Sequence, residues 1–425
     1  MPYRPVTQEE LPLLVEIGER AFRFDASQMR EQLANDSFRY NRTHGRVWEE
    51  EARGVVASMW LFERDITVGG HELAAGLIGM VGVPAEHRRR GYANKMMRGA
   101  LQEMRERELP LSLLFPYSIP FYNRLGYGVA SYVWSIEFPL EELRDFDEMR
   151  RVRRMTPEDM PAMQRLYERV RLRHNGWMER TEWEWRERVL DLPGNADWPQ
   201  KVEGVVVPGE GDELDGYLTY TIADVEGATI ASKARSVLVQ EWVSDGDEAW
   251  RALAGFVAAQ RAQAKFMRYT APEGFPLLHA LHERNTFRDR RNVEFAFRDT
   301  LSMGAGLMGR IVHLEKALRQ RGYPAHVSGE CVVQMRDEQL PANEEPLHLN
   351  IGDGRANVMP AQELQGTRAP IATADARTWA ELYTATLTPG DARTLGRLDA
   401  DDATVDFLSQ AFRGEPWFIH RADWF

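Results

Sequence analysis

The basic residues best placed to do chemistry stand together in one short segment, Arg88-Arg89-Arg90-Gly91-Tyr92-Ala93. An apolar run at residues 81–83 leads into it, and a stretch with helical spacing follows it. Glycine permits a close backbone approach, the first N–H groups of a helix point at an anion, and arginines add charged hydrogen bonds. The segment therefore predicts a phosphate-binding loop. The alternative is an ordinary solvated arginine turn, because short motifs also arise by chance.

The other reactive side chains show no pattern typical of a nucleophile or a metal site. Cys331, the single cysteine, lies in a strand-like run, which is typical of a small buried side chain. His87 is interpreted as a packing or capping residue beside the arginines, and the sequence does not indicate which residues His44 and His71 contact. No metal cofactor is predicted, since no spacing of His, Cys, Asp and Glu matches a metal site.

The segments before and after the arginine loop must position it. A capping box at residues 7–10 predicts a first helix, and residues 55–62, 65–68 and 72–83 predict consecutive antiparallel strands with a glycine turn at 69–70. After the loop, residues 93–108 have helical spacing and residues 111–115 are typical of a buried strand. The order is helix, strands, loop, helix, strand.

A second part of the chain repeats this order from residue 151. A helix cap at residues 155–160 is followed by strands at 203–207, 216–221 and 236–242 and by a helix at 248–262. In place of the arginine loop stands Ser244-Asp245-Gly246-Asp247, whose carboxylates would repel a diphosphate. The second part is therefore predicted not to bind the same ligand.

A third part begins near Thr300 and mixes short helices and strands. Its expected elements are helices at residues 311–318, 375–384 and 404–412, with Asp375 as an N-cap, and strands around residues 332, 347–349 and 371–373. The aromatic end of the chain, residues 417–425, predicts a buried terminus. The sequence thus predicts three domains of α/β (α+β) class at residues 1–150, 151–298 and 299–425.

Composition narrows the classes of function. A length of 425 residues exceeds what one core usually serves, and a net charge of −12 opposes nucleic-acid binding and favours cationic substrates. The sequence contains no run of about 18 apolar residues that could span a membrane, so no membrane partner is expected. The first residues lack the pattern of a secretion signal, and we expect a cytoplasmic protein.

The arginine loop is similar to a family signature. Arg88-x-x-Gly91-x-Ala93 resembles the (Gln/Arg)-x-x-Gly-x-(Gly/Ala) motif of the GNAT superfamily of N-acetyltransferases, between the fourth strand and the next helix. The resemblance implies that the loop grips the diphosphate of acetyl-CoA and that the preceding strand pairs with its pantetheine arm. By resemblance the cofactor contacts are Val81, Val83, Arg88, Arg89, Gly91, Tyr92 and Ala93.

A second segment carries the same resemblance. Phe121-Tyr122 with Gly126-Tyr127 is similar to the family motif Phe-Tyr-x-x-x-Gly-(Phe/Tyr), whose first tyrosine protonates the departing thiolate of CoA. The resemblance assigns this role to Tyr122. A phenol is protonated at neutral pH and is a competent acid for a thiolate. Packing alone is the alternative for both tyrosines, and we prefer it for Tyr127.

The three-part order resembles the Eis (enhanced intracellular survival) family, with an acetyltransferase domain, a degenerate copy and a sterol-carrier-protein-like domain. In that family the carboxylate of a terminal phenylalanine acts as general base, and this sequence ends in Phe425. A terminus that only packs is the alternative. An α-carboxyl has an unperturbed pKa of roughly 3.3–3.7, so an apolar setting or a relaying water must assist it. The family often has an acidic residue beside this phenylalanine, where Trp424 stands here.

The substrate side of the site is less defined by sequence. Candidate contacts are Phe24, Asp25, Met80 and Trp424, with Glu50 or Glu51 as further acidic candidates, and each acid alternatively is a solvated surface carboxylate. The expected reaction is acetyl transfer to an aminoglycoside, polyamine or lysine-like amine by direct attack, in a homo-oligomer that the resemblance suggests is a hexamer. A ligand- or lipid-binding protein with a non-catalytic, CoA-sensing fold is the alternative.

Overall fold

The computed structural model describes residues 2–34, 42–190, 202–224, 235–282, 300–363 and 369–425. Contacts group the chain into two compact units. The first consists of Met1–Ala130, Gly306–Glu415 and Phe425, and the second of Ser131–Ala305 and Pro416–Trp424. The expected domain boundaries at residues 150 and 298 stay predictions, and the latter lies outside the described residues.

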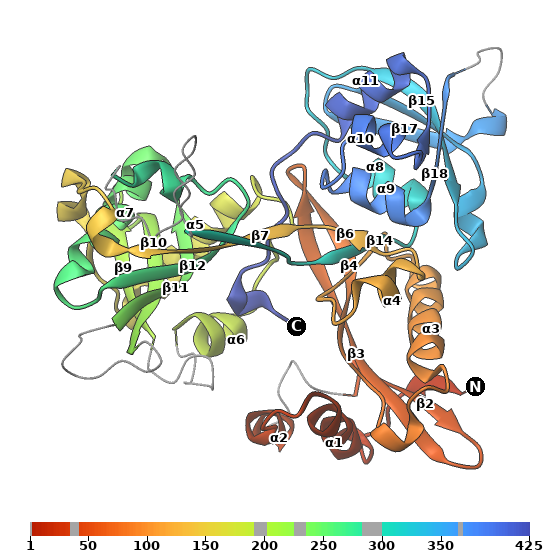
Figure 1. Cartoon of the computed structure of the whole chain (residues 1–425), viewed down its shortest axis with the longest axis horizontal. Coiled ribbons are helices and arrows are strands. Elements are labelled where there is room, and N and C mark those ends of the chain that lie inside the picture. The colour runs from red at the N-terminus through yellow and green to blue at the C-terminus, as the bar shows by residue number, and fades with distance from the viewer. Residues whose placement is uncertain (1, 35–41, 191–201, 225–234, 283–299, 364–368) are drawn as a thin grey trace, which may run out of the picture. The chain divides into compact units, whose positions relative to one another are not determined.

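A seven-stranded sheet forms the frame of the first unit. Its order is β1-β2-β3-β4-β5-β14-β6, with bounds Tyr3–Pro5, Gly45–Glu50, Gly54–Val68, His71–Gly82, Leu111–Leu114, Met308–Ile311 and Gly128–Val129. Helices α1 (Leu11–Phe22) and α3 (Tyr92–Glu106) lie on opposite sides of the β3–β4 hairpin (Figure 1). Two short helices complete this part, α2 (Ser27–Ala34) and α4 (Ile119–Asn123).

The β3–β4 hairpin is longer and more regular than the sequence indicates. The two expected strands at residues 55–62 and 65–68 form one continuous strand, because Glu63 and Arg64 pair opposite Gly76 and Ala75. The antiparallel pairing of the hairpin is confirmed. The first helix begins at Leu11, although the expected contact of the Glu10 carboxylate with the Thr7 N–H is present at 2.9 Å.

Helix α3 packs tightly on the sheet because its apolar residues recur at helical spacing. Its buried side chains include Met96, Met97, Leu101 and Met104. Gly76 on β4 allows the closest approach, since a Cβ at this position would lie 2.1 Å from the Met104 sulfur. This packing fixes the start of α3, and with it the arginine loop, against the end of β4.

The expected helix at residues 311–318 is wrong at its start, because Ile311 belongs to a strand. Met308–Ile311 forms strand β14, which pairs antiparallel with Leu111–Leu114 of β5 and also with β6. Helix α8 begins only at Leu314 and ends at Gln320. The sheet edge at β5 supplies hydrogen-bonding groups that this short apolar segment satisfies, and local helical spacing carries no information about such a distant partner.

A buried ion pair fixes β14 in place. Both Arg310 and Asp337 are almost completely buried, and their side chains form two hydrogen bonds of 2.6 and 2.7 Å. The Arg310 Nε also donates to the Leu125 carbonyl at 3.0 Å, and the Asn343 amide donates to Asp337 at 3.0 Å. The sequence gives no signal for this network, because its members are far apart along the chain.

We expect Asp337→Asn to lower the free energy of unfolding by about 3–5 kcal/mol, since it leaves the buried Arg310 charge uncompensated. Urea denaturation followed by circular dichroism measures the change. The matched control is Asp402→Asn. The Asp402 side chain is 92% exposed and forms an ion pair with Arg393, so its replacement should leave the midpoint of urea denaturation nearly unchanged. Equal effects of both changes would contradict a structural role of the buried pair.

The rest of the first unit is a five-stranded sheet with helices. Its strand order is β17-β16-β15-β18-β19, with bounds Arg355–Pro360, Leu347–Gly352, Gly329–Arg336, Ile371–Asp375 and Leu398–Asp399. Its helices after α8 are α9 (Ala376–Tyr383), α10 (Pro389–Thr394) and α11 (Asp402–Ala411). The expected N-cap is confirmed, because the Asp375 carboxylate accepts the Thr378 N–H at 2.7 Å.

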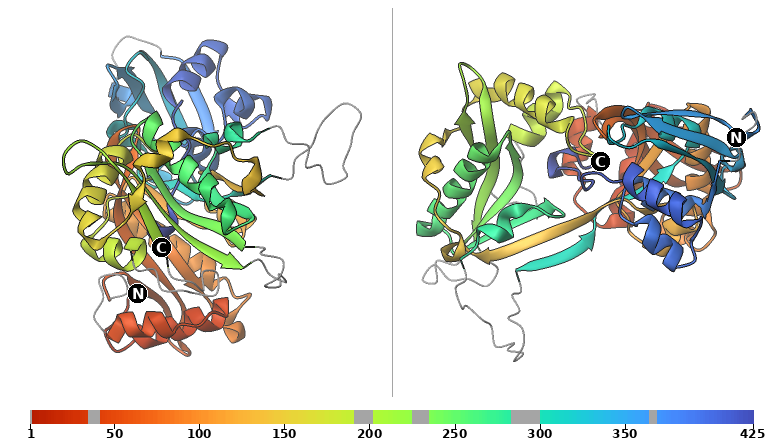
Figure 2. Two further views of the ribbon diagram at one scale, coloured as in Figure 1. Left: turned by 90° about the vertical axis from the view of Figure 1, so that its left-hand side faces the viewer. Right: turned by 90° about the horizontal axis from the view of Figure 1, so that it is seen from above.

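The second unit is built on the same plan. Its strand order is β13-β7-β12-β11-β10-β9-β8, with bounds Leu301–Ala305, Tyr132–Pro139, Phe266–Pro272, Arg235–Ser244, Leu214–Asp224, Glu203–Pro208 and Arg153–Arg154. Helix α5 (Met160–Arg171) packs with Val206 and Tyr217, whereas α7 (Asp247–Ala259) packs with Val205 and Leu218. Alternate strand residues face opposite ways, so the two helices cover opposite faces of the sheet (Figure 2).

The last part of the chain up to Trp424 docks in the second unit. Asp423 is buried and accepts hydrogen bonds of 2.6 and 2.8 Å from Arg180, which also pairs with Glu241 at 2.6 Å. His420 is buried against Trp177, and burial lowers the pKa of its imidazole. The expected burial of the aromatic end is thus correct for residues 417–420, whereas Trp424 is 40% exposed.

None of the helices in the described part of the chain has the length and apolar character that a membrane crossing requires.

Candidate active site

The site in the first unit begins where strands β4 and β5 separate. These parallel strands pair only from Ala75–Leu111 to Ile78–Leu114, although β4 continues to Gly82. Over the same stretch the pairing of β4 with β3 shifts its register, between Ser58 and Trp60 of β3. Met80 of β4 has a positive φ of 50°. Beyond Ile78 the backbone of β4 therefore has no β5 partner, and its polar groups can pair with an extended ligand.

The arginine loop closes one end of this opening. Arg89 and Gly91 both adopt left-handed backbone conformations, with φ of 60° and 79°, and the Arg88 Nε donates to the Val83 carbonyl at 3.2 Å. A Cβ at Gly91 would meet nothing within 4 Å, so the backbone is open there. Left-handed turns and the first amides of a helix gather N–H groups into a concave anion site. The arrangement fits a diphosphate, with exposed arginines around it.

The residues predicted to contact the cofactor differ in how they can do so. Val81 and Val83 are half-buried and pack against the core under α3. Tyr92 is only 4% exposed, and its hydroxyl accepts a 3.3 Å hydrogen bond from Arg53. Tyr92 and Ala93 therefore offer backbone N–H groups at the start of α3 rather than side chains. Their roles stay predictions.

Tyr122 lies on α4, shortly after β5. Its ring is buried and packs edge-on against Phe121 and Tyr127, with ring centres 5.0 and 6.0 Å apart. Burial raises the pKa of its phenol. Tyr127 is different, because its hydroxyl shares a 2.8 Å hydrogen bond with Ser112 in the core. This geometry agrees with packing for Tyr127, whereas the role of Tyr122 as an acid stays a prediction.

Phe425 lies at the point where the two strands separate. A Cβ on Gly79, the first β4 residue beyond the last pair, would be 3.1 Å from the Phe425 carboxyl carbon. The Phe425 ring packs against Phe115, the residue that follows β5, with ring centres 5.2 Å apart. The carboxyl group thus contacts the same stretch of β4 that the extended ligand would follow.

The predicted substrate contacts are only partly brought together. Phe24 and Met80 belong to one apolar cluster that includes Val15. Asp25 is exposed and accepts the Ser27 N–H at 2.9 Å at the start of α2, and this backbone hydrogen bond lowers the pKa of its carboxyl. Asp25 therefore forms a local turn immediately before α2, which does not itself indicate amine binding.

Trp424 belongs to the second unit, where the Arg188 guanidinium donates to its carbonyl at 2.5 Å. The Arg421 guanidinium lies over its ring, 5.4 Å from the centre. Its role beside Phe425 stays a prediction.

Gly79 and Phe115 contribute to this site but were not identified from sequence. Three glycines interrupt the run at residues 72–83, and glycine inside a strand often marks a close approach of another group. A Cβ at Gly76 would clash with Met104, a Cβ at Gly82 would clash with Ile17, and a Cβ at Gly79 would lie close to Phe425. The glycine spacing was therefore a usable signal.

The cysteine singled out from the sequence is a core residue. Cys331 is fully buried, and burial raises the pKa of its thiol to about 12, which agrees with a packing role. Within the described ranges no cluster of three or more His, Cys, Asp or Glu residues is arranged to hold a metal ion.

Comparisons with known families agree with this architecture. Residues 2–130 and 176–301 each match an acetyltransferase (GNAT) domain, and residues 314–419 match a sterol carrier protein domain. The expected fold, two tandem GNAT-type domains followed by a sterol-carrier-protein-like domain, is confirmed.

Individual relatives point the same way. An uncharacterized N-acetyltransferase of Streptomyces coelicolor is 31% identical over 46% of this chain, and the match spans about half of that protein, 49%. The N-acetyltransferase Eis of Mycobacterium tuberculosis is 29% identical over 72% of this chain and 71% of its own length. The crystal structure of a GCN5-related N-acetyltransferase from Anabaena variabilis has the same fold, with a TM-score of 0.83 at 21% identity over 100% of this chain and 99% of that chain. The chain is therefore an Eis-like member of the GNAT superfamily of N-acetyltransferases.

Proposed function

We propose that the protein transfers an acetyl group from acetyl-CoA to a primary amine by direct attack, without a covalent enzyme intermediate. The observation that carries this proposal is the opening between β4 and β5, which has the Gly91 loop at one end and Phe425 against Gly79 where the strands separate. A diphosphate at α3 and a pantetheine arm along residues 79–83 would bring the thioester close to both Tyr122 and Phe425.

Each step of the proposed reaction has a group in this chain. The amine nitrogen attacks the thioester carbonyl, forming a C–N bond, and its surplus proton passes to the Phe425 carboxylate. A backbone N–H near Met80, where the strand register shifts, stabilises the oxyanion. The C–S bond then breaks, and Tyr122 gives its proton to the departing thiolate. A phenol is already protonated at neutral pH, and burial raises the pKa of Tyr122 further.

The natural amine is proposed by class only. The net charge of −12 favours the approach of polyamines, aminoglycosides or lysine side chains. We also propose that the protein works in the cytoplasm as a homo-oligomer, a hexamer, on the strength of its family resemblance. Sedimentation velocity tests the hexamer, and a monomer at micromolar concentration would contradict it.

The function is tested by release of CoA thiol with a panel of aminoglycosides, polyamines and lysine peptides. We expect thiol release that depends on the amine, and a product heavier by one acetyl group in mass spectrometry. No binding of CoA and no thiol release with any amine would overturn the proposal. Co-purified lipid without turnover would instead support the alternative of a ligand-binding protein.

A further inference from the structure

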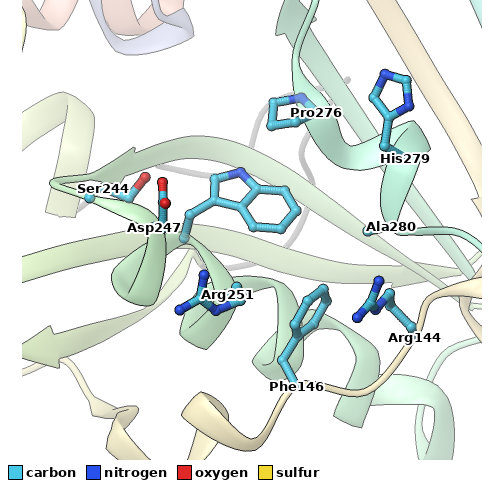
Figure 3. Close-up of a pocket in the computed structure, with 10 residues that line it drawn as sticks. Arg144, Phe146, Ser244, Asp247, Arg251, Pro276, His279 and Ala280 are labelled. Atoms are coloured by element: carbon cyan, nitrogen blue, oxygen red, sulfur yellow. The ribbon is translucent and has the colours of Figure 1, made fainter.

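The second unit contains a surface cavity that has no part in the proposed reaction. Its volume is about 530 Å³, within the range of small-molecule sites. Its walls include Arg144, Phe146, Trp250, Arg251, Pro276 and His279 (Figure 3). Two arginines and two aromatic side chains are thus part of the lining, together with the acidic Asp247.

The cavity lies at the same place in its sheet as the proposed cofactor opening in the first unit. Strands β11 and β12 are parallel and pair only from Ser236–Phe266 to Val239–Tyr269, although β11 continues to Ser244. Ser244 and the residues at the start of α7 line the cavity. The second unit has therefore kept an opening between diverging strands.

The loop at this opening no longer suits a diphosphate. Asp245 forms ion pairs with Arg169 at 2.6 Å and Arg173 at 2.7 Å, so its carboxylate is held beside the loop. Asp247 stands in the first turn of α7, where a negative side chain already occupies the favourable end of the helix dipole. A ligand of this cavity must place its charge elsewhere.

The cation available for that charge is Arg144. Its guanidinium lies over the Phe146 ring at 5.1 Å, and no carboxylate among the described residues pairs with it. Arg251 is partly neutralised, because its Nε donates to Glu148 at 2.5 Å. Asp247 and Arg144 lie at opposite ends of the lining in Figure 3, so an anion at Arg144 avoids the aspartate.

The apolar part of the lining is aromatic. The rings of Phe146 and Trp250 are perpendicular, with centres 5.9 Å apart, and Phe275 packs against Trp250 at 6.4 Å. Perpendicular rings of this kind suit the edge and face of another flat ring.

We propose that this cavity binds a small aromatic carboxylate, with the carboxylate on Arg144 and the ring against Phe146 and Trp250. A guanidinium and a carboxylate form paired charged hydrogen bonds, and the arginine already stacked on Phe146 is held ready for them. The site is independent of the proposed acetyl transfer.

The test is isothermal titration calorimetry of the full chain with 2-naphthoate and with its neutral isostere 2-naphthamide. Saturating CoA is present, so that the cofactor site of the first unit is filled. We expect one naphthoate to bind per chain. Naphthamide should bind about tenfold more weakly, because it lacks the charge that contacts Arg144. Arg144→Gln should weaken the binding of naphthoate by about tenfold and leave the binding of naphthamide unchanged.

The matched control is Arg150→Gln, because Arg150 is 85% exposed and its ion pair with Asp147 is 3.5 Å long. It should change neither affinity. The proposal is overturned if naphthoate and naphthamide bind equally or not at all, or if Arg150→Gln has the same effect as Arg144→Gln. A second CoA bound per chain and lost in Arg144→Gln would also overturn it, because the cavity would then be a cofactor site.

Discussion

Adding Gly-Ser after Phe425 should lower kcat for acetyl transfer by about a hundredfold or more, the usual worth of a positioned general base. The extension converts the Phe425 carboxylate into an amide, which cannot accept the proton of the attacking amine. The carboxyl carbon lies 3.1 Å from the position of a Cβ at Gly79, so the group that is changed adjoins the proposed cofactor strand. Steady-state kinetics with acetyl-CoA and a saturating amine measures the loss.

The control for this change is the purified unextended protein, whose intact mass must correspond to a chain ending at Phe425. Thermal unfolding and the Kd of CoA should stay the same in the extended protein. An unchanged kcat with an intact fold would show that the terminal carboxylate is not the base.

The second large effect is expected for Tyr122→Phe, with kcat lower by about a hundredfold to a thousandfold and little change in the KM for acetyl-CoA. The substitution keeps the ring contacts with Phe121 and Tyr127 but removes the proton for the thiolate. The substitution should lower the rate less when the acetyl donor is a thioester of a more acidic thiol, because that thiolate needs no proton to leave. Single-turnover kinetics with such an analogue and with acetyl-CoA separates the two cases.

The matched control is Tyr127→Phe, which removes a core hydroxyl that bonds Ser112. We expect a small loss of stability, about 1 kcal/mol, and almost normal kcat. Because burial raises the pKa of Tyr122, kcat of the unaltered protein should not decline from loss of this acid between pH 7 and the ordinary tyrosine range near pH 10. If Tyr122→Phe behaves like Tyr127→Phe, the acid is another group.

Local sequence patterns predicted the elements around the site well. The glycine turn, the spacing of Met96 to Met104 and the cap at Asp375 each depend on residues within a few positions of one another. The arginine loop was found for the same reason, since the strand, the glycine and the helix start are adjacent. Its fit to a diphosphate follows from the two left-handed residues, Arg89 and Gly91.

Two features that the sequence could not predict depend on distant partners. Strand β14 is a strand because β5 offers it an edge, and Arg310 is buried because Asp337 pairs with it. The sequence makes Asp25 a candidate amine contact because it is acidic and lies near Phe22 and Phe24, but in the structure it accepts a hydrogen bond from the Ser27 N–H. Short-range patterns do not distinguish a carboxylate that forms a local turn from one that binds a ligand, because both are exposed.

The position of β14 has a consequence for biosynthesis. Met308 pairs with Leu114, which precedes it by 194 positions, so the first sheet cannot be completed until that much more chain has left the ribosome. At the usual 5–20 residues per second, the wait is on the order of ten to forty seconds. During that time β5 presents an open edge, which can pair wrongly with other chains. A fragment that stops near residue 150 would remain in this state permanently, so attempts to produce the acetyltransferase domain alone should include residues 306–311.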